Sequence, residues 1–149
     1  MGNNIVISLE QQFGEVVDII LQHKSHVSKA VNEELLPTAW HVGGYVSAKL
    51  KSEEWGSKVV TQLSEYIRSK RPDIKGYGRS SIYNMVLFYD EYSSETFASI
   101  VERYLNSEFV QPLAGQMPKI LELTTFTYHL VILCRCKSND ERLFLTTIY

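Results

Sequence analysis

Apolar residues recur at intervals of three and four along the first third of the chain, which restricts the possible folds. On an α-helix this spacing places all of them on one face. A stripe of this length needs more than one small partner to bury it, so it is either the spine of a helical bundle or a seam between two copies of the chain. Its members are Leu9, Phe13, Val16, Ile20, Val27, Val31, Leu35, Ala39, Val42, Val46 and Leu50.

Two features interrupt the stripe. Pro37 lacks a backbone N–H, so we expect the helix to kink or break near 33–36. Gly43 and Gly44 either weaken the helix again or let another helix approach closely. The region therefore predicts two helices rather than one.

The rest of the chain alternates helix-length segments with turn residues. A helix over 58–70 should end near Arg71, because the residue before a proline disfavours helical backbone. Residues 72–78 form a turn, followed by helices over about 79–91 and 95–105, a loop over 108–118, a short helix over 119–123 and two final helices. Convincing strand alternation is absent apart from residues 4–9, so the predicted fold class is an all-α helical bundle. The expected N-caps are Ser57, Ser93 or Ser94, Thr124 or Thr125, and Ser138 in a capping box with Glu141.

Length and composition describe an ordinary globular protein. The 149 residues suit one domain, and no apolar run reaches the roughly 20 residues of a membrane span. The N-terminus lacks the features of a signal peptide, and two cysteines one residue apart suit a reducing compartment. We therefore expect a cytoplasmic protein without a membrane partner. The apolar end, ERLFLTTIY, lacks a helix stop, so we expect a piece of a longer protein.

Positive charge is concentrated in the middle of the chain. The segment 58–79 contains six Lys and Arg residues against Glu65 and Asp73, a balance of +4 in a chain of net charge −2. The rest of the chain therefore carries −6. A positive patch on an acidic protein favours a polyanionic partner such as DNA.

The segment over about 38–91 resembles a helix-turn-helix, because two helices are joined by a Pro/Gly turn with positive charge around it. C-terminal helices follow over about 94–149. If Ile82, Met85, Val86 and Tyr89 face the core, Phe88 lies at the rim with the residues that would face duplex DNA. Arg79 could reach guanine or a phosphate and Asn84 could pair with adenine, while the basic turn contacts phosphates. The predicted DNA-binding residues are Lys70, Arg71, Lys75, Arg79, Ser80, Ser81, Tyr83 and Asn84.

Other interpretations remain open. Basic residues at the end of a helix also oppose its dipole, and many helical hairpins never touch DNA. The alternative is an interaction module that forms a homo-oligomer through the N-terminal helices or docks another domain. His23 and His26 lack a third metal ligand, and Asp73 lies in a turn without a second carboxylate for nuclease chemistry. We expect no catalytic site, metal or cofactor in this chain.

Three segments resemble a known family. The segments are VNEELLPTAWHVGGYVSAKL, WGSKVVTQLSEYIRSKRPDIKGYGRSSIYNMVLFYDEY and, with a looser match, LELTTFTYHLVILCRCKSNDERLFL. They are similar to the N-terminal domain of the YhcG-like (DUF1016) bacterial proteins over about residues 28–149. The resemblance implies a DNA-binding or assembly module, over 1–149, that precedes a C-terminal nuclease domain of the PD-(D/E)XK type absent from this chain.

The chain departs from the family pattern at three places. Gly78 replaces a serine, and Val86 replaces a residue that is often basic. The W-S-H cluster of the family corresponds here to Phe126, Tyr128 and His129, so only the histidine is retained. Because these departures remove possible contacts, the resemblance supports the identity of the domain more firmly than any base specificity.

Overall fold

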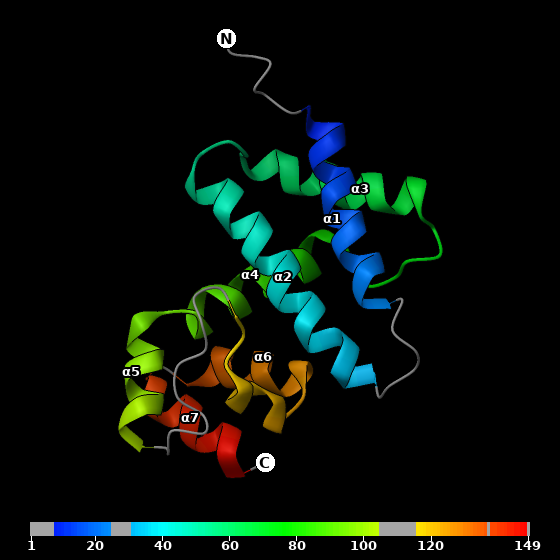
Figure 1. The fold of residues 1–149 in the computed structure, drawn as a ribbon. Coiled ribbons are helices and arrows are strands. Elements are labelled where there is room, and N and C mark those ends of the chain that lie inside the picture. The colour runs from blue at the N-terminus through cyan, green and yellow to red at the C-terminus, as the bar shows by residue number, and fades with distance from the viewer. Residues whose placement is uncertain (1–7, 25–30, 105–115, 137, 149) are drawn as a thin grey trace.

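The computed structural model describes residues 8–24, 31–104, 116–136 and 138–148, and no strand occurs among them. This confirms the all-α prediction; residues 4–7 and most of the expected loop at 108–118 lie outside the described part. No helix in the described ranges has both the length and the apolar character to cross a membrane. The elements in Figure 1 are α1 (Leu9–Lys24), α2 (Val31–Lys51), α3 (Ser57–Lys70), α4 (Arg79–Tyr92), α5 (Glu95–Tyr104), the 3-10 helix η3 (Lys119–Leu123), α6 (Phe126–Arg135) and α7 (Asn139–Ile148).

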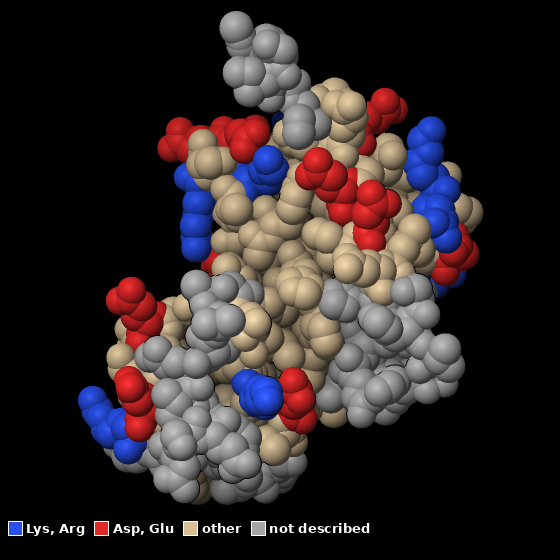
Figure 2. All heavy atoms as spheres, in the orientation of Figure 1, with Lys and Arg blue, Asp and Glu red and all other residues tan. Residues whose placement is uncertain are grey.

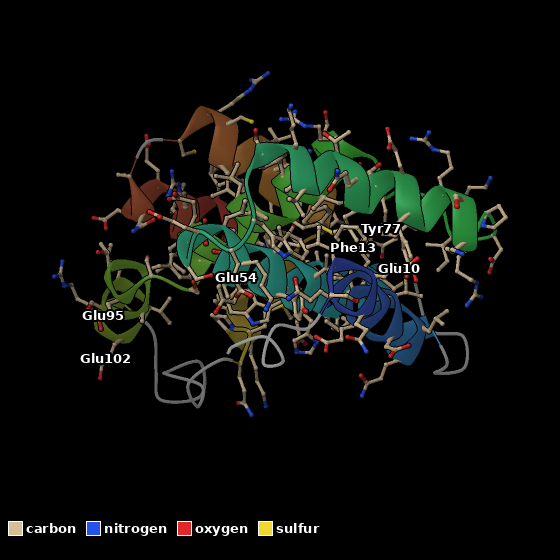
Figure 3. The ribbon with its side chains drawn as sticks, turned by 90° about the horizontal axis from the view of Figure 1, so that it is seen from above. Glu10, Phe13, Glu54, Tyr77, Glu95 and Glu102 are labelled. Carbon is tan, nitrogen blue, oxygen red and sulfur yellow. The ribbon has the colours of Figure 1, made fainter. Side chains whose placement is uncertain are left out.

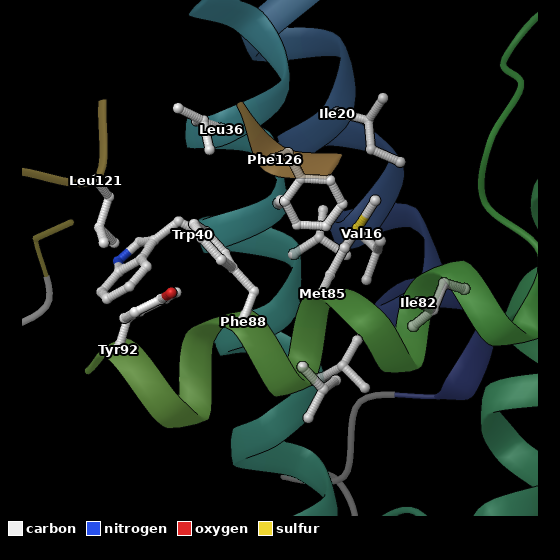
Figure 4. Close-up of a cluster of buried hydrophobic side chains, with 14 of the residues drawn as sticks. Val16, Ile20, Leu36, Trp40, Ile82, Met85, Phe88, Tyr92, Leu121 and Phe126 are labelled. Carbon is white, nitrogen blue, oxygen red and sulfur yellow. The ribbon is translucent and has the colours of Figure 1, made fainter. Parts of the chain in front are cut away.

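Helix α4 occupies the centre of the bundle. It packs most extensively on α2 and also contacts α3, α5 and α6. Figure 1 shows α1, α2 and α3 grouped in one half and α5, α6 and α7 in the other. The large side chains of α4 interlock with residues from both halves in Figure 4, where Phe88 lies near Trp40 and Phe126. The core is therefore continuous through α4.

Most of the apolar stripe of α1 and α2 is buried inside the chain, whereas Leu9 at the start of α1 is 39% exposed. These side chains pack into one core cluster with those of α3 and α4. The stripe is thus the spine of a bundle, the first of the two predicted alternatives, although Val27 lies outside the described residues. The buried members are Phe13, Val16, Ile20, Ala39, Val42 and Val46.

The prediction of two helices in this region is confirmed, but the predicted break near 33–36 is wrong. Pro37 lies inside α2, and α1 and α2 are instead separated between Lys24 and Val31. A proline within a helix costs about 3 kcal/mol. Its neighbours Leu36 and Trp40 are at most 2% exposed, and burying two large apolar side chains stabilises by a similar or larger amount. Tertiary packing therefore outweighs the local preference.

The glycine pair of α2 marks the place where α4 crosses it. A Cβ atom added to Gly43 would clash with the backbone carbonyl of Met85, and one added to Gly44 would lie 2.9 Å from Cε2 of Tyr89. Two backbones can approach this closely only where a side chain is missing. The second predicted role of the glycines, close approach of another helix, is confirmed.

A buried histidine joins α4, η3 and α6. His129 in α6 is fully buried, with Nε2 2.8 Å from the carbonyl oxygen of Leu121 and Nδ1 3.2 Å from the hydroxyl of Tyr92. Because a carbonyl only accepts, Nε2 carries the proton and Nδ1 accepts from Tyr92. Burial lowers the pKa of His129, since the charged imidazolium would be desolvated. The histidine is therefore held neutral.

Side-chain caps fix several helix starts. The hydroxyl of Ser94 accepts from the amide of Phe97 at 3.1 Å, and that of Thr125 accepts from Tyr128 at 3.1 Å. Ser138 accepts from the amide of Glu141 at 3.2 Å, the serine half of the predicted capping box. The prediction for Ser57 is wrong by one position, because Gly56 is the N-cap of α3.

Candidate nucleic-acid interface

The basic residues of the middle segment gather where α3 ends and α4 begins. Arg68 and Lys70 lie in the last turn of α3, Arg71 and Lys75 follow in the connecting segment, and Arg79 is the first residue of α4. We call these five residues the α3–α4 basic surface. All are exposed except Arg71, which is half-buried. Figure 2 shows Lys and Arg side chains at the right edge, where α3 ends in Figure 1.

The connecting segment 71–78 is held by local contacts. The amide of Arg71 donates to the carbonyl of Ile67 at 2.8 Å, and the amide of Ile74 donates to the carbonyl of Arg71 at 2.9 Å. Ile74 is only 5% exposed, so its side chain anchors the segment to the core. Gly76 has a φ of +90°, a conformation that other residues rarely adopt. With eight residues, the segment is longer than the three or four of an ordinary helix-turn-helix turn.

The start of α4 has no side-chain cap. Gly78 is its N-cap with extended backbone, and a glycine offers no oxygen to the first amides of the helix. The first turn contains no acidic residue either. The positive end of the helix dipole is therefore not neutralised locally, and it lies beside Arg79. Such a helix end attracts a phosphate or another anion.

Within the described part of the chain, only one member of the basic surface is neutralised by an acidic neighbour. Arg71 forms a bidentate pair with Asp73, with Nε to Oδ1 at 3.0 Å and Nη2 to Oδ2 at 2.9 Å, and this pairing raises its pKa. The guanidinium of Arg79 lies over the ring of Tyr83, 4.9 Å from its centroid. Among the described residues, the other basic side chains here form no ion pair. Most of the positive charge therefore stays available to an anion.

Apart from Glu65 in α3 and Asp73 in the connecting segment, acidic side chains lie on other parts of the surface. Glu10, Glu15 and Asp18 of α1 are exposed, and Figure 2 shows acidic groups over this helix in the upper centre. Glu95 and Glu102 of α5 lie at the far side of the molecule from the segment 71–78 in Figure 3. A polyanion would therefore approach from the side of α3 and the connecting segment rather than across α1.

The comparison with protein families accounts for nearly the whole chain. Residues 15–148, which run from α1 to α7, match the DUF1016 N-terminal domain. The chain belongs to this family. Searches of curated proteins and of solved structures found no match. The family membership implied by the sequence resemblance is thus confirmed.

In this DUF1016 domain, α4 exposes only a small part of its surface. Of the residues predicted to face a groove, Arg79, Ser80 and Asn84 are exposed, while Ser81 and Tyr83 are half-buried. The prediction that Phe88 lies at the rim is wrong. That side chain is fully buried because α4 contacts helices on more than one side. The exposed residues of this set lie within the first two turns, so α4 can meet a partner with its N-terminal end but not with its whole length.

The departures from the family pattern have different structural places. Gly78 is the uncapped N-cap described above, so the missing hydroxyl lies at the candidate interface. Val86 is 8% exposed and belongs to the core, where a basic residue would not reach a ligand. His129 is buried in the hydrogen-bond network with Tyr92. The retained histidine therefore has a structural role in this chain.

The structure adds residues to the candidate site that the sequence did not single out. A cavity of about 280 Å³ lies between α3 and the segment 71–78, and Ser64, Arg68 and Tyr77 line it. Arg68 is one of the six basic residues of segment 58–79, but its spacing does not mark it as a binding residue. No sequence pattern points to Ser64 as part of a site. No group of three or more His, Cys, Asp or Glu residues in the described part of the chain is arranged to hold a metal ion.

Proposed function

We propose that this domain binds duplex DNA through the α3–α4 basic surface, and that it does so without catalysing a reaction. The observation that carries the proposal is the convergence of five basic side chains on one end of the molecule, next to an uncapped helix N-terminus. Four of them make no ion pair with described residues. Such a surface suits the closely spaced phosphates of DNA.

The exposure of the side chains favours phosphate contacts from some residues and base contacts from others. The phosphates would be contacted by Lys70, Arg71 and Lys75, which the sequence already predicts. Arg68 would also contact a phosphate. Arg79 and Asn84, near the start of α4, are the residues best placed to reach base edges. Ser80 and Ser81 would contact the sugar-phosphate backbone beside them, and Tyr83 would hold the Arg79 guanidinium in place. Because every residue of α4 after Asn84 is buried or half-buried, the helix would meet the groove with its N-terminal end.

The test is duplex binding by fluorescence anisotropy over a range of salt concentrations. In the Lys70→Ala/Lys75→Ala/Arg79→Ala variant, we expect affinity to fall sharply and the slope of log affinity against log salt to decrease by about two, since Lys70 and Lys75 each lose a phosphate contact that contributes about 0.9 and Arg79 loses a contact to a base edge. The matched control is Lys58→Ala/Lys119→Ala/Arg135→Ala. It removes the same charge from exposed residues outside the surface, and it should bind nearly as the natural chain does.

Two results would contradict the proposal. The natural chain could fail to bind duplex DNA at low salt, or the control variant could lose as much affinity as the interface variant. The second result would mean that binding depends on overall charge rather than on this surface.

The alternative function is an interaction module that forms a homo-oligomer or docks a C-terminal nuclease domain without contacting DNA. Among the described residues, four large apolar side chains on α1, η3, α6 and α7 are at least 39% exposed, and a partner surface could cover them. A homo-oligomer through α1 and α2 would have to use their outer faces, because most of the apolar stripe is buried within the chain. The exposed side chains are Leu9, Leu123, Val131 and Phe144.

A further inference from the structure

The cavity beside the α3–α4 basic surface has a composition unlike that of a simple phosphate site. Its volume is about 280 Å³, and Ile67, Ile74 and the ring of Tyr77 provide apolar walls. The charged side chains Arg68 and Lys75 also line it. A volume near the lower end of the range for small-molecule pockets, about 300–1,000 Å³, is larger than one phosphate group needs. The cavity therefore fits a ligand that has both an apolar part and a negative charge.

A buried hydroxyl without a partner lies in the same cavity. Ser64 is 4% exposed, and its side chain forms no hydrogen bond with any described residue. A helical serine or threonine commonly donates to the carbonyl one turn earlier, as Thr146 does to Arg142 at 2.8 Å. A buried polar group without a partner is unfavourable, and in native proteins it usually has a water, an ion or a ligand as its partner. Ser64 thus offers a ligand one directional contact.

We infer that this cavity accepts one unpaired nucleotide, with its base inside and its phosphate at the mouth. The inference rests on the proposed function, because DNA bound at the surface would bring the nucleotide there. The base would lie between the apolar walls and exchange a hydrogen bond with Ser64. The phosphate would lie among Arg68, Lys75 and the first amides of α4, which begin after Gly78, itself a residue of the cavity lining.

This arrangement has a consequence for the kind of DNA that is preferred. In a continuous duplex, a base must unpair and unstack before it can enter a pocket. DNA that already contains an unpaired nucleotide avoids this cost. One stacked base typically changes affinity by a factor of about ten. We therefore expect the domain to bind such DNA roughly tenfold more tightly than a fully paired duplex of the same length.

The experiment compares two duplexes by anisotropy at one salt concentration, one fully paired and one with a single unpaired 2-aminopurine nucleotide. The fluorescence of 2-aminopurine should change as the base enters the cavity of the natural chain. Ser64→Leu should fill the cavity and abolish the preference, whereas Ser64→Ala keeps the space and should retain most of it. Circular dichroism establishes that both variants fold, and the fluorescence signal of the natural chain tests the inference even if one does not.

The outcomes separate this inference from the proposed function. Salt-dependent binding of both duplexes with equal affinity and no fluorescence change would overturn the nucleotide pocket and leave DNA binding intact. Failure to bind either duplex would overturn both. Competition by free deoxyadenosine monophosphate at low concentration, with no preference between the duplexes, would identify a free nucleotide as the ligand and would also overturn the inference.

Discussion

The same substitution at two glycines should change stability in opposite directions. Gly14 lies in α1, and a Cβ atom there would meet no other atom within 4 Å. Gly43 lies in α2, where a Cβ atom would clash with the backbone carbonyl of Met85. Alanine is favoured over glycine in a helix by about 1 kcal/mol. At Gly14 only this preference applies, so Gly14→Ala should raise the free energy of unfolding by about that amount.

At Gly43 the helix preference is opposed by a steric cost. The atom in the way belongs to the backbone of α4, so a change of rotamer cannot relieve the clash and the helices must move apart. Overpacking of this kind costs about 1–3 kcal/mol, or occasionally more. Because the clash is with backbone atoms, the upper end of this range applies, and after the gain of about 1 kcal/mol in helix preference we expect Gly43→Ala to destabilise by about 2 kcal/mol. The two variants should therefore differ by about 3 kcal/mol.

The assay is urea unfolding followed by circular dichroism. For a chain of this size, 1 kcal/mol corresponds to about 2–4 °C in Tm, so thermal unfolding provides a second measurement. A double-mutant cycle adds a control, because Tyr89→Ala should relieve the cost of Gly44→Ala, where the clash is with a side chain. Met85→Ala should not rescue Gly43→Ala. Equal stabilisation by Gly14→Ala and Gly43→Ala would refute the close crossing of α2 and α4.

Three further predictions follow from caps, burial and charge. Burial lowers the pKa of His129, so as pH falls this histidine takes up a proton in the unfolded chain before it does so in the folded chain. The free energy of unfolding should therefore decrease below about pH 6.5, with a contribution from His129 that approaches 1.4 kcal/mol per pH unit. Urea unfolding at several pH values should show a weaker dependence of stability on pH for His129→Gln. Thr125→Ala removes a cap and should cost about 1 kcal/mol, whereas Ser57→Ala should cost little, because Gly56 is the cap there. Asp73→Asn releases Arg71 and, under the proposed function, should tighten DNA binding and steepen its salt dependence by up to about one.

Each of these predictions has a result that contradicts it. An unchanged pH dependence in His129→Gln would show that His129 is not held neutral. A large loss of stability in Ser57→Ala would mean that the helix begins as the sequence indicated. Weaker DNA binding by Asp73→Asn would indicate that the Arg71–Asp73 pair orders the connecting segment instead of competing with phosphates.

Local signals in the sequence were sufficient for most helix boundaries. The helix predicted over 58–70 is α3 (Ser57–Lys70), and that over 79–91 is α4 (Arg79–Tyr92). Pro72 ends one helix by restricting its predecessor, and the hydroxyls of Ser94 and Thr125 start others through short-range hydrogen bonds. These effects act over a few residues, so they can be read without knowledge of the fold.

The predictions were wrong where contacts between residues far apart in the sequence determine the structure. Pro37 is accommodated within α2 because its neighbours pack into the core, and Phe88 is buried because α4 has neighbours on several sides. Sequence periodicity assigns one apolar face to a helix and cannot show that a second face will be covered. The cavity at Ser64 is likewise formed by α3 and the segment 71–78 together. No pattern within either segment indicates it.

The central position of α4 limits how the domain can use its basic surface. A recognition helix that lies along a groove needs one exposed face for several turns, whereas every residue of α4 after Asn84 is buried or half-buried. The same burial holds Arg79 and Asn84 on a helix packed against both halves of the bundle. Little conformational freedom would then be lost when these residues meet a ligand, which favours affinity. A surface with phosphate contacts and few rigid base contacts should therefore bind many sequences with similar affinity, and differences between DNA structures should exceed differences between sequences.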